Sequence, residues 1–225
     1  MSDSETLSLP TLAILGGTGK EGPGLALRWA NAGYPVVIGS RLAERARSTA
    51  DELNAILGID TIRGMENSQA AMFAQICVLT VGYTAHQPAL ESLKQDLRGK
   101  ILVDATARVD FRNPLPPAPP SAGRMAQDLL GPQVRVVAAF QNVPAHTLRR
   151  NLGKDLDLDV LICSDDIAAA EEVIPLARAA GMRGYYAGGL DNALVIEGIT
   201  SVLISLNEYY KVKNASISIT GLQVE

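Results

Sequence analysis

The sequence predicts an α/β protein with a doubly wound, mostly parallel sheet and a small C-terminal extension of helix and strand. Three observations support this fold class. Short apolar runs alternate with helical patterns through most of the 225 residues. The apolar runs are continuous rather than alternating, as in strands that helices cover on both faces. A glycine-rich turn follows the first run and precedes the first helix.

The first half of the chain alternates strand and helix regularly. Short apolar runs predict strands at 12–15, 36–38, 61–62, 76–81 and 100–105. Helical spacing, or a high content of Ala, Glu and Arg, predicts helices at 22–32, 41–57 and 87–97. Strands separated by helices are typical of parallel pairing through crossover connections.

The second half is less regular. The proline-rich segment 113–120 must be a loop, because proline lacks a backbone donor and fixes φ; it is either a stiff surface connection or a flap over a site. Beyond it we expect helices at 126–130 and 167–180, and strands at 134–140, 160–163, 185–186 and 215–219. Asp165 or Asp166 is the expected N-cap of the 167–180 helix. The helix at 192–210 is apolar on nearly all faces, which predicts burial in the core or against a second subunit.

Composition limits the function classes. A formal charge of −4 without a basic run argues against a nucleic-acid partner. Cys77 and Cys163 lie in apolar runs and are expected to be buried thiols. With two histidines and no Cys-x-x-Cys, no metal site is expected.

No membrane partner is expected either. The first eight residues are polar and acidic, unlike a signal peptide. The apolar stretch 193–206 is too short to span a bilayer and is interrupted by Glu197 and Thr200. The expected compartment is the cytoplasm.

The glycine-rich turn indicates a dinucleotide site. Gly17-x-Gly19-x-x-Gly22 directly follows the first strand. In this motif the first glycine makes the tight turn, the second lets a pyrophosphate approach the backbone, and the third lets helix and strand pack closely. The helix N-terminus then offers free N–H groups to the phosphates. We therefore expect a Rossmann domain whose cofactor contacts include Gly17, Thr18, Gly19, Lys20, Glu21 and Gly22.

The end of the second strand favours NADP(H) over NAD(H). NAD sites usually place a carboxylate there for the ribose 2′-hydroxyl, whereas this chain has Ser40 and Arg41. A hydroxyl and a guanidinium suit a 2′-phosphate, and Arg45 lies one helical turn further on the same face. The alternative is that both arginines share a solvated helix face with Glu44.

The nicotinamide is expected across the carboxyl ends of later strands. Two segments should line it: Thr80, Val81 and Gly82 after the fourth strand, and 139–145 after a later one. Neither contains a good general acid or base, and His86 and His146 are expected to be exposed loop residues. Reduction of a carbonyl usually needs a proton donor, whereas hydride exchange between two cofactors does not.

Four motifs together carry a family resemblance. They are the glycine turn followed by Gly39-Ser40-Arg41, and the segments 139–145 (AFQNVPA), 163–166 (CSDD) and 187–192 (AGGLDN). From residue 12 to 222 the sequence resembles the F420H2:NADP oxidoreductases, also called NADPH-dependent F420 reductases. Members of that family carry His where this chain has Gln141, and Pro where it has Gly82 or Gly189.

The resemblance implies hydride transfer between NADP(H) and the deazaflavin coenzyme F420 without a dedicated acid or base. It implies that Gln141 and Val143 flank the stacked rings and position the hydride. Cofactor contacts would also come from Ala139, Asn142 and Pro144. A homodimer built partly on the C-terminal helix is implied as well.

Other functions remain open at this point. One is an NADPH-dependent reductase of a flavin such as FMN, or of a small carbonyl or imine. Another is a non-enzymatic NADP-binding redox sensor. For the chain as a whole we expect a flexible N-terminus at 1–9 and a Rossmann NADP-binding domain at 10–190. Residues 191–225 should form a C-terminal helix and strand that pack on the core and on a dimer partner.

Overall fold

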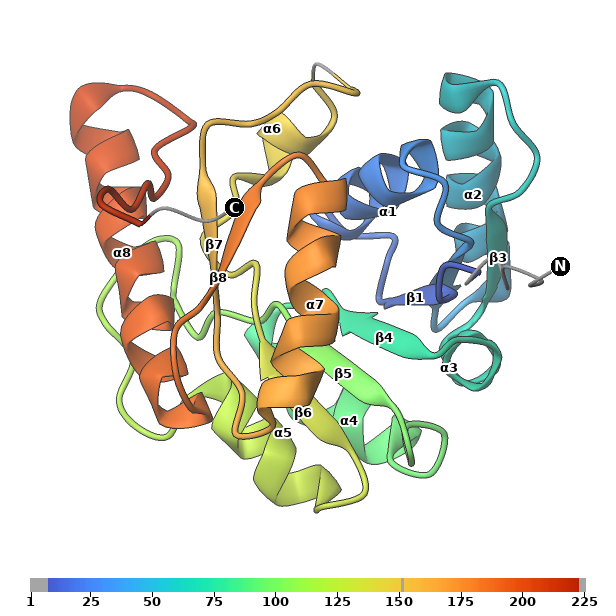
Figure 1. Ribbon diagram of the computed structural model, residues 1–225, viewed down its shortest axis with the longest axis horizontal. Coiled ribbons are helices and arrows are strands. Elements are labelled where there is room, and N and C mark those ends of the chain that lie inside the picture. The colour runs from blue at the N-terminus through green and yellow to red at the C-terminus, as the bar shows by residue number, and fades with distance from the viewer. Residues whose placement is uncertain (1–7, 151, 223–225) are drawn as a thin grey trace, which may run out of the picture.

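The centre of the fold is a six-stranded parallel sheet with the order β3-β2-β1-β4-β5-β6 (Figure 1). The structure is a computed structural model that describes residues 8–150 and 152–222. The strands are β1 (Leu12–Leu15), β2 (Val36–Ser40), β3 (Arg63–Glu66), β4 (Ile76–Leu79), β5 (Ile101–Asp104) and β6 (Arg135–Ala138). The strand order reverses between β1 and β4, which confirms the predicted doubly wound fold.

Helices cover both faces of this sheet. On one face lie α1 (Gly22–Asn31) and α2 (Ala43–Leu57); on the other lie α3 (Asn67–Phe73), α4 (Tyr83–Leu93) and α5 (Ala122–Leu130). Within β1, Leu12 and Ile14 join the first apolar cluster, whereas Ala13 and Leu15 join the second. This burial on both faces explains why the strands are continuous apolar runs.

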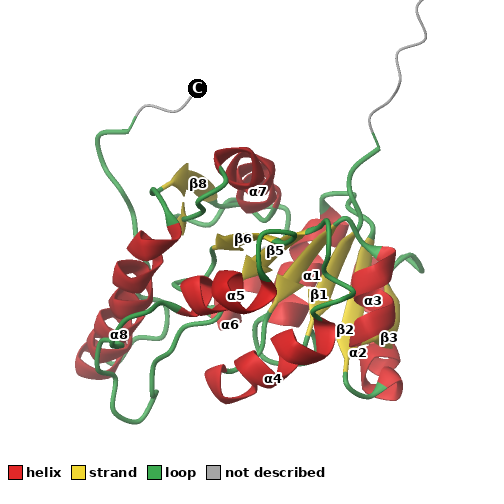
Figure 2. Cartoon of the chain, turned by 90° about the horizontal axis from the view of Figure 1, so that it is seen from below, coloured by secondary structure: helices red, strands yellow, loops and turns green. Residues whose placement is uncertain are grey.

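A second, two-stranded parallel sheet lies beyond β6. It consists of β7 (Asp159–Ile162) and β8 (Arg183–Tyr186), which α7 (Ile167–Ala179) connects. An antiparallel bridge joins it to the main sheet: Ala138 N donates to Cys163 O at 2.8 Å, and Cys163 N donates to Ala138 O at 3.0 Å. In Figure 2, β8 and α7 lie together next to β6.

Two expectations need correction. The third strand lies at Arg63–Glu66 rather than 61–62, and α3 was not foreseen. Segment 215–219 is not a strand, because a single backbone bond from Asp159 N to Ile217 O and a bond from Ile219 N to the Asp159 carboxylate hold it instead of a ladder. Asp166 caps α7 by accepting from Ala169 N at 3.0 Å, which confirms one of the two expected N-cap residues. The flexible N-terminus predicted at 1–9 lies largely outside the described residues.

The long C-terminal helix α8 (Ala193–Tyr210) follows the short turn η1 (Leu190–Asn192). It lies at the end of the molecule opposite α2 (Figures 1 and 2). By length and composition alone Leu190–Tyr210 could cross a membrane, so the stretch is longer than the 193–206 expected, and 39% of its apolar window is buried inside the protein. One side of α8 packs on the core, and the other exposes an apolar row of Val195, Val202, Leu206, Tyr209 and Tyr210.

Helix α1 fastens the second half of the chain to the first. The Arg28 guanidinium is buried and donates to the carbonyls of Leu148, Arg150, Lys154 and Ala180 at 2.8–3.1 Å. The next residue, Trp29, donates its indole N–H to Leu176 O at 2.7 Å. The segment after β6, including α6 (Ala145–Leu148), is thereby held against the helix that begins at the glycine turn.

We predict that Arg28→Met destabilises the protein by about 3–5 kcal/mol, because four carbonyls, those of Leu148 and Ala180 in buried bonds, lose a charged donor. Urea unfolding measures this change. Arg47→Met is the matched control: Arg47 is exposed on α2 and makes no side-chain hydrogen bond within the described residues, so its change should stay below about 0.5 kcal/mol. Similar losses in the two variants would contradict the role of Arg28.

Candidate functional site

The glycine turn joins β1 to α1. Its left-handed residue is Gly16, with φ +69°, just ahead of the first glycine of the motif. A Cβ atom built on Gly16 would lie 2.4 Å from Cγ1 of Val81. A Cβ on Gly22 would lie 2.7 Å from both Gly17 Cα and Thr80 Oγ1, which confirms that the third glycine permits close packing.

The middle of the turn is open. Gly19 and Lys20 are exposed and Thr18 is half-buried. A Cβ on Gly19 would find its nearest neighbour at 3.7 Å, so among the described residues no atom crowds this backbone. This geometry leaves the approach to the α1 N-terminus free for a phosphate group.

Asn67, the first residue of α3, holds the turn from the side. Its Oδ1 accepts from Gly16 N at 3.1 Å. A Cβ on Gly39 would lie 2.7 Å from the same oxygen, so the glycine before Ser40 makes room for this contact. Sequence reasoning missed Asn67 because it missed the short helix that Asn67 begins.

Glu21 precedes α1 with a buried carboxyl group. Among the described residues its Oε1 has no hydrogen-bond partner. Burial raises the pKa of Glu21 from 4.5 to about 8. The group is therefore largely neutral at pH 7, and no negative charge at this position opposes a phosphate at the helix N-terminus.

The end of β2 carries the residues predicted to bind a 2′-phosphate. Ser40 is buried, and its Oγ accepts from Leu42 N at 3.3 Å. Arg41 and Arg45 are exposed. Within the described part of the chain neither guanidinium lies within 4.0 Å of a carboxylate, Glu44 included. Both arginines are thus available to an anion.

The segment after β4 meets the glycine turn. Thr80 donates to Leu15 O through its N–H at 3.0 Å and through its hydroxyl at 3.3 Å. Thr80 and Val81 are half-buried, and Gly82 is exposed. Gly82 has φ −68° and open space around a built Cβ, so proline would fit there; at Gly189 a Cβ would lie 2.9 Å from the Asp165 carboxylate.

The loop after β6 is constrained by an unusual backbone conformation. Phe140 is buried with φ +74°, and its ring packs edge-on against Trp29 with centroids 5.6 Å apart. Val143 N donates to Phe140 O at 3.0 Å and closes the turn. Ala139 is fully buried, whereas Val143 keeps 9% of its surface exposed. Such strain in a non-glycine residue marks a locally over-determined segment.

Polar contacts fix this loop to α8. Asn142 Nδ2 donates to Ile196 O at 2.9 Å and to Thr200 Oγ1 at 3.0 Å. Thr200 Oγ1 donates to Gln141 O at 3.2 Å. The Asn142 amide donors are therefore turned toward α8, and its side chain positions the loop. Pro144, at the N-cap of α6, is half-buried.

A buried His–Asp pair lies beside the loop. His86 Nε2 is 2.6 Å from Asp104 Oδ2, with the side chains 1% and 0% exposed. Gln141 Nε2 donates to Asp104 O at 3.2 Å, and Thr106 N donates to Asp104 Oδ1 at 3.0 Å. The expectation of an exposed loop histidine at position 86 was wrong, because His86 lies in the first turn of α4 and meets the carboxylate that ends β5.

Three buried polar atoms around Asp104 lack partners among the described residues: His86 Nδ1, Thr106 Oγ1 and Gln141 Oε1. Each belongs to a residue that bonds Asp104 through another atom. The carboxyl end of β5 thus carries buried polar atoms to which no described residue is hydrogen-bonded. Sequence reasoning found only Gln141 of this group, although an aspartate ending a buried strand was a usable signal.

Glu197 ties α8 to the same edge. Its Oε1 accepts from Ala122 N at 2.6 Å, and its Oε2 lies 3.3 Å from Arg108 Nε. Burial raises the pKa of Glu197 from 4.5 to about 7; the nearby Asp104 adds to the rise, whereas Ala122 N and Arg108 oppose it. The glutamate that interrupts the apolar helix is therefore a buried anchor.

The proline-rich loop is fastened at several points. Arg108 also donates to Ala118 O and lies over the Tyr83 ring at 5.7 Å. Ser201 Oγ donates to Leu115 O at 2.9 Å. These bonds favour a stiff connection over a flap.

The remaining residues considered in the sequence analysis are the two cysteines, His146 and any metal ligands. Both thiols are buried, and burial raises the pKa of Cys77 and of Cys163 to about 12, which confirms core cysteines. His146 is exposed on α6. Across residues 8–150 and 152–222 no group of three or more His, Cys, Asp or Glu could hold a metal ion.

Comparisons with known proteins agree with this geometry. Residues 11–108 match the family described as "NADP oxidoreductase coenzyme F420-dependent". The chain is 40% identical over 221 residues to the F420-dependent NADP reductase of Methanothermobacter thermautotrophicus, covering 94% of this chain and 95% of that protein. It is 39% identical over 224 residues to the reductase of the same name from Methanocaldococcus jannaschii, covering 95% and 99%.

A solved structure is also similar. It is a putative F420-dependent NADP reductase from Arthrobacter sp. FB24, with a TM-score of 0.78 and 25% identity, covering 94% of this chain and 100% of that one.

Glu21 should make stability depend on pH. Its folded pKa of about 8 lies above the ordinary 4.5, so the folded state binds an extra proton, and the free energy of unfolding falls as pH rises through that window. Between pH 5 and 8 the free energy of unfolding should fall less for Glu21→Gln than for the unchanged protein. Denaturant titrations at several pH values measure it, with exposed Glu44→Gln as control. Parallel curves for the unchanged protein and Glu21→Gln would refute the assignment.

Proposed function

The chain belongs to the family of coenzyme F420-dependent NADP oxidoreductases, and from that premise we propose that it transfers hydride between NADP(H) and coenzyme F420. The enzyme is an NADP-dependent oxidoreductase of the F420 reductase type. Nicotinamide and deazaflavin each carry the hydride chemistry in their own rings. The protein therefore has to bind the two rings, stack them and exclude competing reactions.

One observation carries the proposal: segments following β1, β2, β4 and β6 meet at the carboxyl edge of the sheet. The turn after β1 offers an open helix N-terminus, and the end of β2 offers two available guanidiniums. The loop after β6 is locked by Phe140 and α8 at the same edge. Locking matters because hydride transfer needs the reacting carbons about 3–3.5 Å apart.

Within this site we assign roles as proposals. Ser40, Arg41 and Arg45 bind the 2′-phosphate, and Thr80, Val81 and Gly82 lie beside the nicotinamide. Gln141 and Val143 flank the stacked rings. The His86–Asp104 pair fixes the end of β5 that Gln141 contacts, and we assign it a positioning part because both side chains are buried.

We also propose a cytoplasmic homodimer. Support comes from the exposed apolar row on α8, which would leave water on association. Buried Glu197 and the bonds of α8 to Leu115 and Asn142 favour a helix docked on its own domain rather than in a membrane. Neither a nucleic acid nor a membrane is a proposed partner.

The direct test mixes the purified protein with NADPH and F420 and follows the loss of absorbance of oxidised F420. We expect rapid loss, with Gln141 as a tuning difference from relatives that carry His. No loss, with NADPH binding intact, would overturn the proposal. FMN and a panel of small carbonyls and imines, tested in parallel, would then identify a reductase of another substrate, and inactivity with all of them would favour a redox sensor.

Arg41→Ala tests the cofactor preference. The variant should weaken NADPH binding by about 10–100-fold and NADH binding by less than about threefold, because only NADPH offers a 2′-phosphate to the guanidinium. Titration of both nucleotides measures this, with Arg47→Ala as the control, since Arg47 is exposed on α2, the helix that follows Arg41. Equal losses for NADPH and NADH would mean that Arg41 does not contact the 2′-phosphate.

A further inference from the structure

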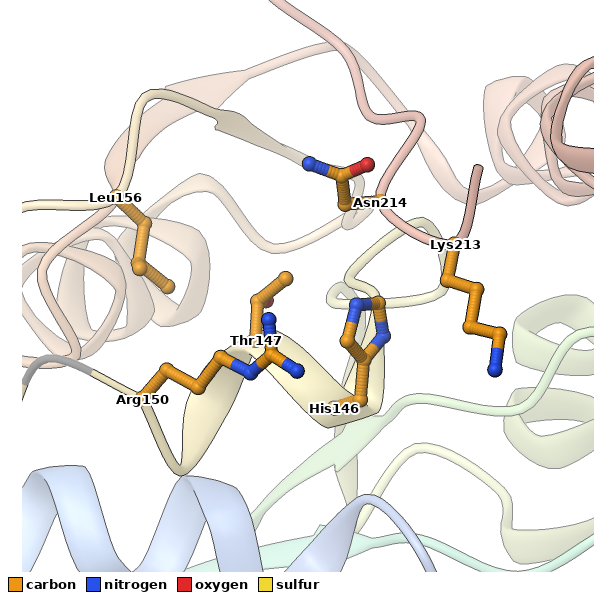
Figure 3. Close-up of a pocket in the computed structure, with 6 residues that line it drawn as sticks. All are labelled: His146, Thr147, Arg150, Leu156, Lys213 and Asn214. Atoms are coloured by element: carbon orange, nitrogen blue, oxygen red, sulfur yellow. The ribbon is translucent and has the colours of Figure 1, made fainter. Parts of the chain in front are cut away.

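A pocket of about 380 Å³ lies between α6 and the segment that follows α8 (Figure 3). Its walls come from α6, the loop before β7 and the C-terminal segment. The lining residues are His146, Thr147, Arg150, Leu156, Lys213 and Asn214. None of the residues that we place at the NADP(H) and hydride site lines it.

The pocket is basic. Three of its six lining side chains, those of His146, Arg150 and Lys213, carry or can carry positive charge, and no carboxylate lines it. Within the described residues no Asp or Glu lies within 4.0 Å of these three groups. Next to Leu156, Asp157 is 3.5 Å from Arg183 instead. In Figure 3, Arg150 extends toward Thr147 rather than away from α6.

The pocket wall is held rigidly while its cationic ends stay available. Arg150 O and Leu148 O accept from the buried Arg28 guanidinium at 2.8 and 2.9 Å, and Thr147 Oγ1 donates to Pro144 O at 2.7 Å. Across the described residues the side chains of Arg150 and Lys213 make no hydrogen bond to the protein and are exposed. A fixed backbone with unengaged cations is pre-organised for an anion.

The pocket lies close to the hydride site along the chain. Helix α6 begins at Ala145, immediately after Pro144 and two residues after Val143. A ligand whose ring stacked beside Val143 would have to extend only along α6 to reach the pocket. The volume lies at the low end of ligand pockets, which suits a short anionic chain rather than a whole coenzyme.

We propose that this pocket binds the anionic tail of the second substrate, an inference that rests on the proposed deazaflavin function. Coenzyme F420 carries a phosphodiester and glutamyl carboxylates beyond its ring and ribityl chain. Arg150 is suited to pair with a phosphate or carboxylate through its planar fork, and Lys213 and His146 add point charges. The ring supplies the chemistry, and the pocket selects deazaflavins that bear the acidic tail.

The test compares F420 with its tail-less deazaflavin precursor, which has the same ring and ribityl chain without the phosphate. Steady-state kinetics with NADPH are measured for the unchanged protein, for the double variant Arg150→Ala/Lys213→Ala, and for Lys154→Ala. Lys154 is an exposed cation in the same loop region that does not line this pocket, so it is the matched control.

We expect the double variant to raise KM for F420 by about tenfold or more at low ionic strength and to change kcat by less than about twofold. The KM for the tail-less deazaflavin should not change, and the F420 defect should shrink at high salt. Lys154→Ala should behave as the unchanged protein. An unchanged KM for F420, or equal losses for both substrates, would overturn the tail site.

The two proposals fail separately. Turnover of either deazaflavin by the unchanged protein supports hydride transfer whatever the double variant does. If neither is reduced, the hydride proposal fails, and fluorescence titration of both deazaflavins against the unchanged and double-variant proteins decides the pocket. Weaker binding of F420 alone in the double variant supports the tail site, and identical binding refutes it.

Discussion

The Arg28 guanidinium is the contact on which the arrangement of this protein depends. It lies in α1, the helix whose N-terminus faces the glycine turn, and it binds carbonyls more than a hundred positions away in sequence. Burial lowers the pKa of Arg28, and the nearby Asp155 opposes this shift. The buried guanidinium therefore carries a desolvation cost. Together with Trp29 it sets how far the phosphate turn lies from the loop after β6. The stacking geometry of two cofactors would therefore be governed by one helix.

Negative charge at the carboxyl edge is controlled in two ways. Glu21 is buried without a partner and is held neutral, whereas Asp104 and Glu197 are buried with donors that satisfy them. At the end of β2, Arg41 and Arg45 stand exposed, with no carboxylate within 4.0 Å of either guanidinium among the described residues. This distribution suits a cofactor with three phosphates, although the chain as a whole has a formal charge of −4.

The sequence was informative where structure depends on local patterns. Continuous apolar runs predicted five of the six main strands at or near their places, and the glycine spacing predicted the turn. The short α3 and strand β3 carry little periodicity and were missed or displaced, and 215–219 has strand propensity but no neighbouring ladder. The His86–Asp104 pair and the Arg28 contacts depend on which distant residues meet, which no local pattern encodes. Ser40 and Arg41 were found because their position relative to the turn is fixed by the fold.

The single bridge between Ala138 and Cys163 has a consequence for the order in which the molecule assembles during synthesis. All six strands of the main sheet are present once residue 138 has emerged, and domains generally fold from the N-terminus first. The loop that holds Gln141 and Val143 needs later partners: Cys163 at its base, and Ile196 and Thr200 in α8. A nascent chain can thus complete its nucleotide half well before its acceptor half closes. The nascent chain would be able to bind NADPH before it could pass the hydride to a second substrate. The docking of α8 would complete the second half of the site.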